Sequence, residues 1–221
     1  MTCPLEIAVV TGGHSYEVQA FDAFWKAMPG VNAVLQNIDD FTASSDEVRD
    51  SYAAVVFFFM PAGEPETDDA PWFAGNPRAA LERLGSTGQG IVVLHHAILA
   101  YRSWQAWADI CALPDRGGFG FAPDEDVRVK VAHTDHPIAK GIEDWSITDE
   151  VYTINSSLPA GECDVLMTTD HPKSMAALAW TRMHGLSRVF CFQPGHDNTA
   201  WSNPVFAEVL RRGIHWTARA I

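Results

Sequence analysis

The chain has 221 residues, of which 47% are hydrophobic and 19% charged, and its formal net charge at pH 7 is −13. This composition favours a folded protein with a well-buried interior over a disordered chain, and so much negative charge without a basic cluster argues against nucleic acid as a partner. No stretch reaches the roughly 18 apolar residues of a membrane span, and the first residues lack a secretion-signal pattern, so we expect a cytoplasmic protein without membrane contact.

The first half of the chain alternates strand and helix patterns, which predicts parallel strands joined by crossover helices. Strands are expected at 5–10, 31–36, 53–59 and 91–94, and helices at 16–28, 76–84 and 104–110. The segment Pro61–Pro71 is rich in acidic and turn residues, and it is interpreted either as a solvated connection or as a lid over the functional rim.

The second half has a looser pattern. Residues from about 112 to 160 are interpreted as an insertion or edge elaboration, with a strand at 127–132 and a turn beginning at His136. Late strands are expected at 165–168, 177–181 and 189–192, and a helix at 204–219 closes the chain. We therefore expect residues 1–221 to form one α/β domain on a doubly wound, mostly parallel sheet with an elaborated edge.

Three predicted strands lead into a histidine. His14 follows the first strand, His95 directly follows the strand at 91–94, and His196 follows the last strand. The carboxyl ends of parallel strands open onto one crevice, so these imidazoles are expected to share a pocket, although a loop role is the alternative for His14 and His196. His96 is adjacent to His95, and one of the pair is expected to face the pocket while the other supports packing.

The segment Gly90–Ala97 has the outline of the strand-to-helix elbow at which many α/β enzymes present a nucleophile. Histidine stands there in place of cysteine or serine, and imidazole suits proton transfer or metal ligation. Cys111 lies too far along the chain to replace the nucleophile, and no serine has a G-x-S-x-G context. Acyl-enzyme chemistry is therefore disfavoured.

A set of short motifs runs in order through nearly the whole chain: Thr11-Gly12-Gly13-His14, Val93-Leu94-His95, His136-Pro137-Ile138, Gly141-Ile142, Asp149-Glu150-Val151-Tyr152, Ala179-Trp180, Arg188-Val189-Phe190, Gly195-His196 and Gly213-Ile214-His215-Trp216. Together they resemble the ThuA-like (trehalose utilisation) proteins. The resemblance implies the flavodoxin-like fold of the class I glutamine amidotransferase-like superfamily, with histidine in place of the amidotransferase cysteine. It also implies a role in carbohydrate metabolism rather than glutamine hydrolysis.

Carboxylates in the irregular section are candidates to complete the site. Asp149 and Glu150 can orient an imidazole, act as a base or bind a metal, and a solvated acidic turn is the alternative. The resemblance makes Glu150 the preferred member. We expect His96, Asp149, Tyr152 and Trp104 to bind substrate, although Trp104 can equally cover the edge of the core.

The catalytic candidates are His95, His14, His196 and Glu150. They offer three nitrogens and an oxygen, which suit a divalent metal such as zinc and equally suit metal-free acid–base catalysis. No other cofactor is indicated. Two functions stay open: an enzyme that hydrolyses, isomerises or eliminates at a keto-sugar or glycoside, and a non-catalytic small-molecule-binding or regulatory module. The apolar run at 57–59 and the elaborated edge are also compatible with a homo-oligomer.

Overall fold

A computed structural model describes residues 3–67 and 75–221. Its strands are β1 (Leu5–Gly12), β2 (Val31–Asn37), β3 (Ala54–Phe59), β4 (Gly90–Leu94), β5 (Gly120–Val131), β6 (Trp145–Thr153), β7 (Asp164–Thr168), β8 (Ala177–His184) and β9 (Ser187–Phe192). They form one nine-stranded sheet in the order β2-β1-β3-β4-β9-β8-β7-β5-β6.

The sheet has a parallel half and an antiparallel half. Strands β2, β1, β3, β4 and β9 are parallel, whereas each neighbouring pair from β9 through β8, β7 and β5 to β6 is antiparallel. All six residues of β3 are buried, as a continuous apolar run predicts for a strand covered on both faces. The α/β architecture predicted from the alternating pattern is therefore observed, with an antiparallel extension at one side.

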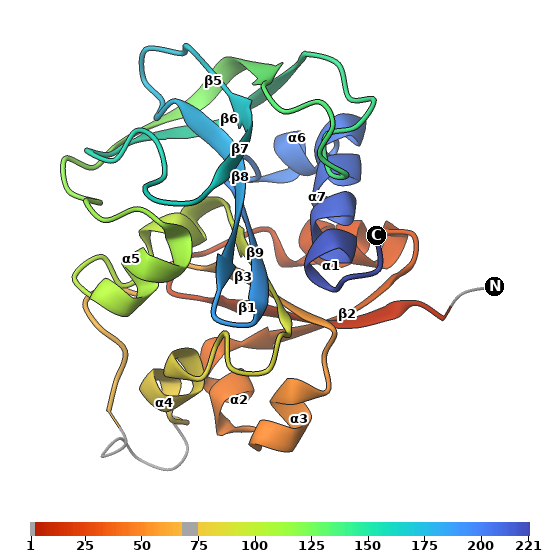
Figure 1. Ribbon diagram of the computed structural model, residues 1–221, viewed down its shortest axis with the longest axis vertical. Coiled ribbons are helices and arrows are strands. Elements are labelled where there is room, and N and C mark those ends of the chain that lie inside the picture. Colours follow the sequence, from red (N-terminus) through yellow and green to blue (C-terminus); the bar gives the residue numbers. More distant parts are fainter. Residues whose placement is uncertain (1–2, 68–74) are drawn as a thin grey trace.

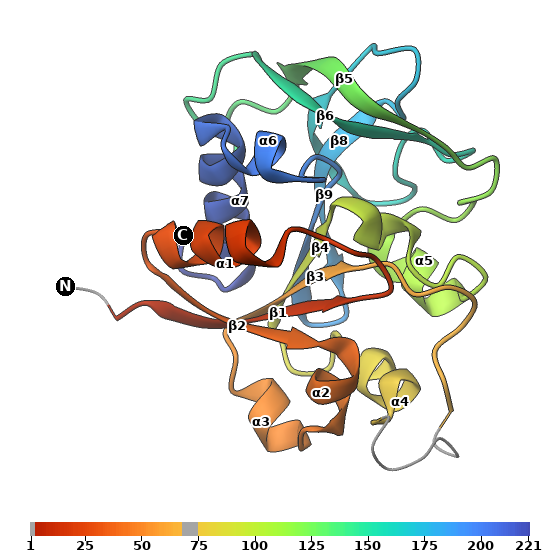
Figure 2. The ribbon, with the colours of Figure 1, turned by 180° about the vertical axis from the view of Figure 1, so that it is seen from behind.

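Helices cover both faces of the parallel half. They are α1 (Val18–Ala27), α2 (Ile38–Ala43), α3 (Asp46–Asp50), α4 (Pro77–Glu82), the 3₁₀ helix η2 (His95–Leu99), α5 (Gln105–Cys111), α6 (Asn198–Trp201) and α7 (Pro204–Thr217). Figures 1 and 2 show α1, α6 and α7 on one side, and α2, α4 and α5 on the other. None of the helices in the described ranges is long and apolar enough to cross a bilayer.

Side chains of one strand alternate between two hydrophobic cores. Phe58 packs with Phe21 of α1, while Phe57 and Phe59 pack on Trp107 of α5. On the α1 side, α7 lies so close to β9 that a Cβ on Gly213 would overlap the ring of Phe190. The two layers of helices hold the parallel strands, and hence their carboxyl ends, in fixed positions.

The irregular section adds β5 and β6 to the far edge of the sheet, as Figure 1 shows at its top. The strand predicted at 127–132 begins earlier, at Gly120, and β6 was not predicted. Part of the predicted loop or lid at Pro61–Pro71 lies outside the described residues.

Candidate functional site

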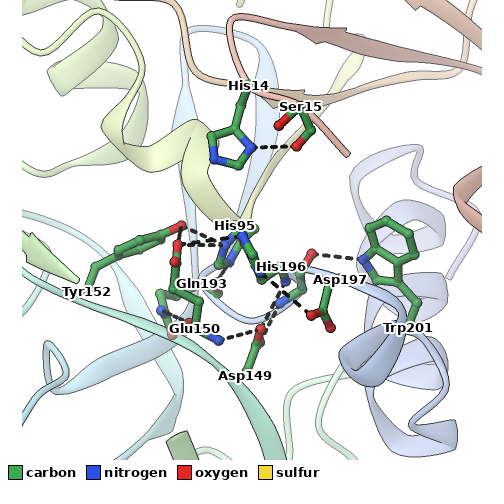
Figure 3. Close-up of polar contacts among 11 residues, drawn as sticks. His14, Ser15, His95, Asp149, Glu150, Tyr152, Gln193, His196, Asp197 and Trp201 are labelled. Atoms are coloured by element: carbon green, nitrogen blue, oxygen red, sulfur yellow. Dashed lines mark hydrogen bonds and ion pairs between the residues drawn. The ribbon is translucent and has the colours of Figure 1, made fainter. Parts of the chain in front are cut away.

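The histidines gather where the carboxyl ends of the parallel strands meet. The strand order reverses beside β1, which pairs with both β2 and β3, and such a reversal opens a crevice at the strand ends. The ring centroid of His196 lies 5.3 Å from that of His95 and 5.8 Å from that of His14. The structure thus brings together three rings that are far apart in the sequence (Figure 3).

His95 is held at the start of η2, where the chain turns sharply after β4. Its φ of 52° is in the left-handed region, and its side chain is fully buried. Its Nδ1 donates to the carbonyl oxygen of Gln193 over 2.7 Å, because a carbonyl can only accept. This bond fixes the ring so that Nε2 faces Tyr152, whose Oη lies 2.6 Å away.

Tyr152 links His95 to Glu150. The hydroxyl of Tyr152 donates to Oε1 of Glu150 over 2.7 Å. Burial, together with the neighbouring Glu150 carboxylate, raises the pKa of Tyr152 well above its usual value. Burial also works to raise the pKa of Glu150, but His95 and Tyr152 outweigh it and lower that pKa to about 2. A neutral phenol therefore faces an ionised carboxylate.

Tyr152 joins His95 and Glu150 in one hydrogen-bonded chain. Its hydroxyl oxygen lies within hydrogen-bond distance of both Nε2 of His95 and Oε1 of Glu150. Because Tyr152 has one hydroxyl proton, both contacts are hydrogen bonds only when a second proton is shared along the chain. A proton can therefore pass along imidazole, phenol and carboxylate, in that order.

His196 lies on the other side of Glu150. Its Nε2 is 3.9 Å from Oε1 of Glu150, and its Nδ1 is 3.8 Å from Oδ2 of Asp197. Burial, followed by the electrostatic effect of His95, lowers the pKa of His196, so its ring is largely neutral at pH 7. Two imidazoles in different environments therefore flank the same carboxylate, and such differences are how neighbouring groups divide acid and base roles.

Asp149 holds the backbone of this site. Its carboxylate accepts backbone N–H groups from Gly195 over 2.6 Å, Glu150 over 2.9 Å and His196 over 3.0 Å. Burial raises its pKa, although these bonds and the nearby His95 act in the opposite direction. Asp149 was expected to bind substrate, but its side chain is buried and its oxygens are occupied by the backbone. It therefore positions its neighbours instead.

His14 and His96 form the remaining wall of the cluster. The exposed His14 follows a tight turn in which a Cβ on Gly13 would lie 2.6 Å from the backbone of Met60. The ring of His96 packs on those of His14 and Phe58, at centroid distances of 4.6 and 4.3 Å. Burial, followed by the charges of His95 and His14, lowers the pKa of His96 well below its usual value.

Trp104, expected at the substrate rim, lies in the core. Its side chain is 6% exposed, its ring packs on Tyr101, and the guanidinium of Arg78 lies over it at 5.6 Å. None of its ring contacts within the described ranges joins it to the histidine cluster. The alternative interpretation, that it covers the edge of the core, agrees with this packing.

Gln193 is a site residue that the sequence interpretation missed. Besides its carbonyl bond to His95, its Nε2 donates to the backbone oxygen of Glu150 over 3.3 Å. The available signal was its position directly after β9, in the run that leads to His196. Its amide connects the parallel half of the sheet to β6.

Three side chains could hold a metal ion. The ligand atoms of His95, Glu150 and His196 lie within 4.8 Å of one another, and His14 is not part of this group. Zinc at about 2.0–2.1 Å from each ligand would draw them to about 3.4 Å apart, so the donors would have to approach and Tyr152 would have to release His95. The bond from Nδ1 of His95 to a carbonyl is the support that metal-bound imidazoles usually have.

Comparison with known proteins identifies the family. The family model ThuA, described as trehalose utilisation, matches residues 6–217. The chain belongs to the ThuA family. No curated protein sequence matches it.

Solved structures agree with the ThuA assignment and define the fold. A putative ThuA-like protein from Parabacteroides merdae is 20% identical, with a TM-score of 0.73 over 98% of this chain and 91% of its own. A "cytoplasmic protein" from Salmonella typhimurium is 10% identical, with a TM-score of 0.69 over 96% and 99%. A glutamine amidotransferase from Thermotoga maritima is 8% identical, with a TM-score of 0.53 over 96% and 98%. This ThuA chain therefore has the glutamine amidotransferase-like fold, with His95 at the elbow.

Proposed function

We propose that this ThuA protein is a cytoplasmic enzyme that moves protons on a small carbohydrate, with a keto-sugar as the favoured substrate class. The observation that carries the proposal is the hydrogen-bonded chain from His95 through Tyr152 to Glu150, which lies beside His196. The family description, trehalose utilisation, supports a carbohydrate. The printed name of the Salmonella relative supports the compartment.

Isomerisation of a keto-sugar needs one base and one acid. The base removes the proton from the carbon beside the carbonyl, the C–H electron pair forms the C=C bond of an enediol, and the carbonyl oxygen takes up a proton. In this proposal His196 is the base, and His95 supplies the proton to oxygen once Tyr152 has released Nε2 of His95. Tyr152 and Glu150 stabilise the protonated form of His95 until that transfer. Protonation of the former carbonyl carbon, with loss of the neighbouring hydroxyl proton, completes the isomer.

Solvent exchange tests this function without knowledge of the product. Purified protein is incubated in D₂O with a panel of keto-sugars and glycosides, and NMR follows deuterium entering the carbon beside the carbonyl. We expect exchange with the wild type and a rate about 100-fold lower in Tyr152→Phe, which keeps the ring but breaks the proton chain. Tyr101→Phe is the matched control, because Tyr101 is also buried but contacts Phe59 and Trp104 instead.

Two outcomes would contradict the proposal. Sugars that bind without exchange or turnover would favour a non-catalytic binding module. Equal exchange by the wild type and Tyr152→Phe would remove the proton chain from the mechanism.

A metal-assisted form of the reaction is the second candidate, because His95, Glu150 and His196 are close enough to share an ion. A bound divalent metal would polarise the carbonyl oxygen. Elemental analysis, followed by the exchange assay after chelation, separates the two forms. Exchange that survives chelation supports metal-free catalysis, and exchange restored only by added zinc supports the second candidate.

A further inference from the structure

His96 is a buried polar side chain of the cluster that the proposed proton chain does not use. It is 1% exposed, and neither of its ring nitrogens makes a hydrogen bond within the described part of the chain. An imidazole carries at least one N–H in either protonation state, so a buried donor is left without an acceptor. Native proteins rarely keep such a group, because an unmade hydrogen bond in the interior costs stability.

The position of His96 shows what can satisfy it. The ring lies 5.2 Å from the ring of His95, which belongs to the proton chain, and 4.6 Å from the ring of His14. The ring of Phe58, at 4.3 Å, offers no acceptor, and the backbone of Phe59, which acts to raise the pKa of His96, does not meet the geometry of a hydrogen bond. The exposed His14 is the contact of His96 that adjoins solvent, so an acceptor can reach His96 from that side.

We propose that His96 is a substrate-binding residue whose ring N–H donates to the carbonyl oxygen of an α-hydroxy ketone, after the ring of His14 moves aside. This inference rests on the proposed function, since it assigns the oxygen that becomes negatively charged when the neighbouring carbon loses its proton. A donor already in place before the reaction stabilises that charge without reorganisation. His14 is suited to move, because its one hydrogen bond among the described residues is from Nδ1 to the adjacent Ser15 carbonyl.

His96→Phe separates a binding role from a structural one. Phenylalanine fills a similar space beside Phe58 and removes both unpaired nitrogens, so the thermal unfolding midpoint should stay the same or rise. The exchange rate with the wild type's best keto-sugar should fall about 100-fold, the usual loss for one such donor. In His96→Gln, the amide N–H should restore part of the rate.

His215→Phe is the matched control. Nε2 of His215 is also buried without a partner, but His215 lies on α7 against Gly30, away from the histidine cluster. Its exchange rate should equal that of the wild type. A large drop in the unfolding midpoint of His96→Phe, or a wild-type exchange rate in that variant, would overturn the inference.

A direct binding measurement keeps this inference distinct from the proposed function. Ring ¹⁵N NMR of the wild type is recorded while dihydroxyacetone, the smallest α-hydroxy ketone, is added. We expect the ring nitrogens of His96 to shift and those of His215 to stay unchanged. If His96 shifts but no sugar shows exchange, the proposed function fails and the donor role stands. If exchange occurs without a shift at His96, the donor role fails and the proposed function stands.

Discussion

The carboxylate of Asp149 holds His196 by its backbone: Oδ1 of Asp149 accepts the N–H of His196 over 3.0 Å. Its second oxygen accepts the N–H of Gly195 over 2.6 Å. A further bond, from the indole of Trp201 to the carbonyl of Gly195 over 2.8 Å, ties the same loop to α6. The ring of His196 therefore depends on a strand from the far edge of the sheet.

Asp149→Asn should destabilise the protein. An asparagine keeps one acceptor oxygen but turns an NH₂ group towards backbone N–H donors, which leaves at least one of them unpaired. We expect the free energy of unfolding in urea to fall by about 1–3 kcal/mol. Asp144→Asn is the control, because the exposed Asp144 accepts a single backbone bond, from Val131. Equal losses in the two variants would show that the three backbone bonds of Asp149 contribute no more to the free energy of unfolding than the single backbone bond of Asp144.

Gly213→Ala tests the close packing of α7 on β9. Alanine favours a helix over glycine by about 1 kcal/mol, but its Cβ would overlap the ring of Phe190. Overpacking costs about 1–3 kcal/mol, so a net loss of unfolding free energy is expected. Thermal unfolding of the single variant and of the double variant with Phe190→Leu measures the coupling. The loss should shrink in the double variant, and a stabilised single variant would contradict the packing argument.

Glu208 gives a pH-dependent contribution to stability. Hydrogen bonds from Arg211, and then from Arg212, lower the pKa of Glu208 from 4.5 to about 2 despite partial burial. Because the folded pKa lies below the unfolded one, the stabilisation is complete above about pH 4.5 and is lost as the pH falls through 2. Glu208→Gln should cost about 0.5 kcal/mol at pH 7. Urea unfolding of both proteins between pH 2 and 7 should show this difference closing at the acid end; a constant difference would exclude the ionic origin.

Arg116 is a buried guanidinium that organises the chain after η2. It donates to the backbone oxygens of Ala100 over 2.6 Å, Tyr101 over 2.8 Å and Trp104 over 3.1 Å. A lysine carries its three N–H donors on a single nitrogen, so it cannot reproduce the pattern in which the two terminal nitrogens of the guanidinium reach different carbonyls. We expect Arg116→Lys to lose about 2 kcal/mol of unfolding free energy. Arg219→Lys, at an exposed residue with one such bond to Leu186, should stay within about 0.5 kcal/mol of the wild type.

The parallel half of the fold was predictable because its inner strands, β1, β3, β4 and β9, are largely buried on both faces. A continuous apolar run such as Ala54–Phe59 is typical of such a strand. Strand β6 was missed for a physical reason: its inward positions are Trp145, Ile147, Asp149 and Val151, so a carboxylate interrupts the apolar alternation. The buried aspartate that supports the site is what concealed the strand.

The candidate site was also predictable only in part. The histidines were predictable from single positions, because each follows a parallel strand directly or through a short turn. The contact between Tyr152 and His95 depends on four antiparallel strand pairings and their registers: β9 with β8, β8 with β7, β7 with β5, and β5 with β6. No local sequence pattern encodes those pairings. The sequence interpretation placed Trp104 at the rim because the sequence alone does not distinguish an aromatic residue in a short loop from one at a core position.

The sheet changes from parallel to antiparallel pairing between β9 and β8, and the residues of the histidine cluster come from both sides of this change. All of its imidazoles and Asp197 come from the parallel side, whereas Asp149 and Glu150 come from the outermost strand. During folding, a chain that has completed only the parallel side would carry the histidines without Asp149 and Glu150. The site would then be completed late in folding, when the hairpin of β5 and β6 docks on the edge of the sheet. A relative with a different β5–β6 hairpin would place different side chains beside the same histidines.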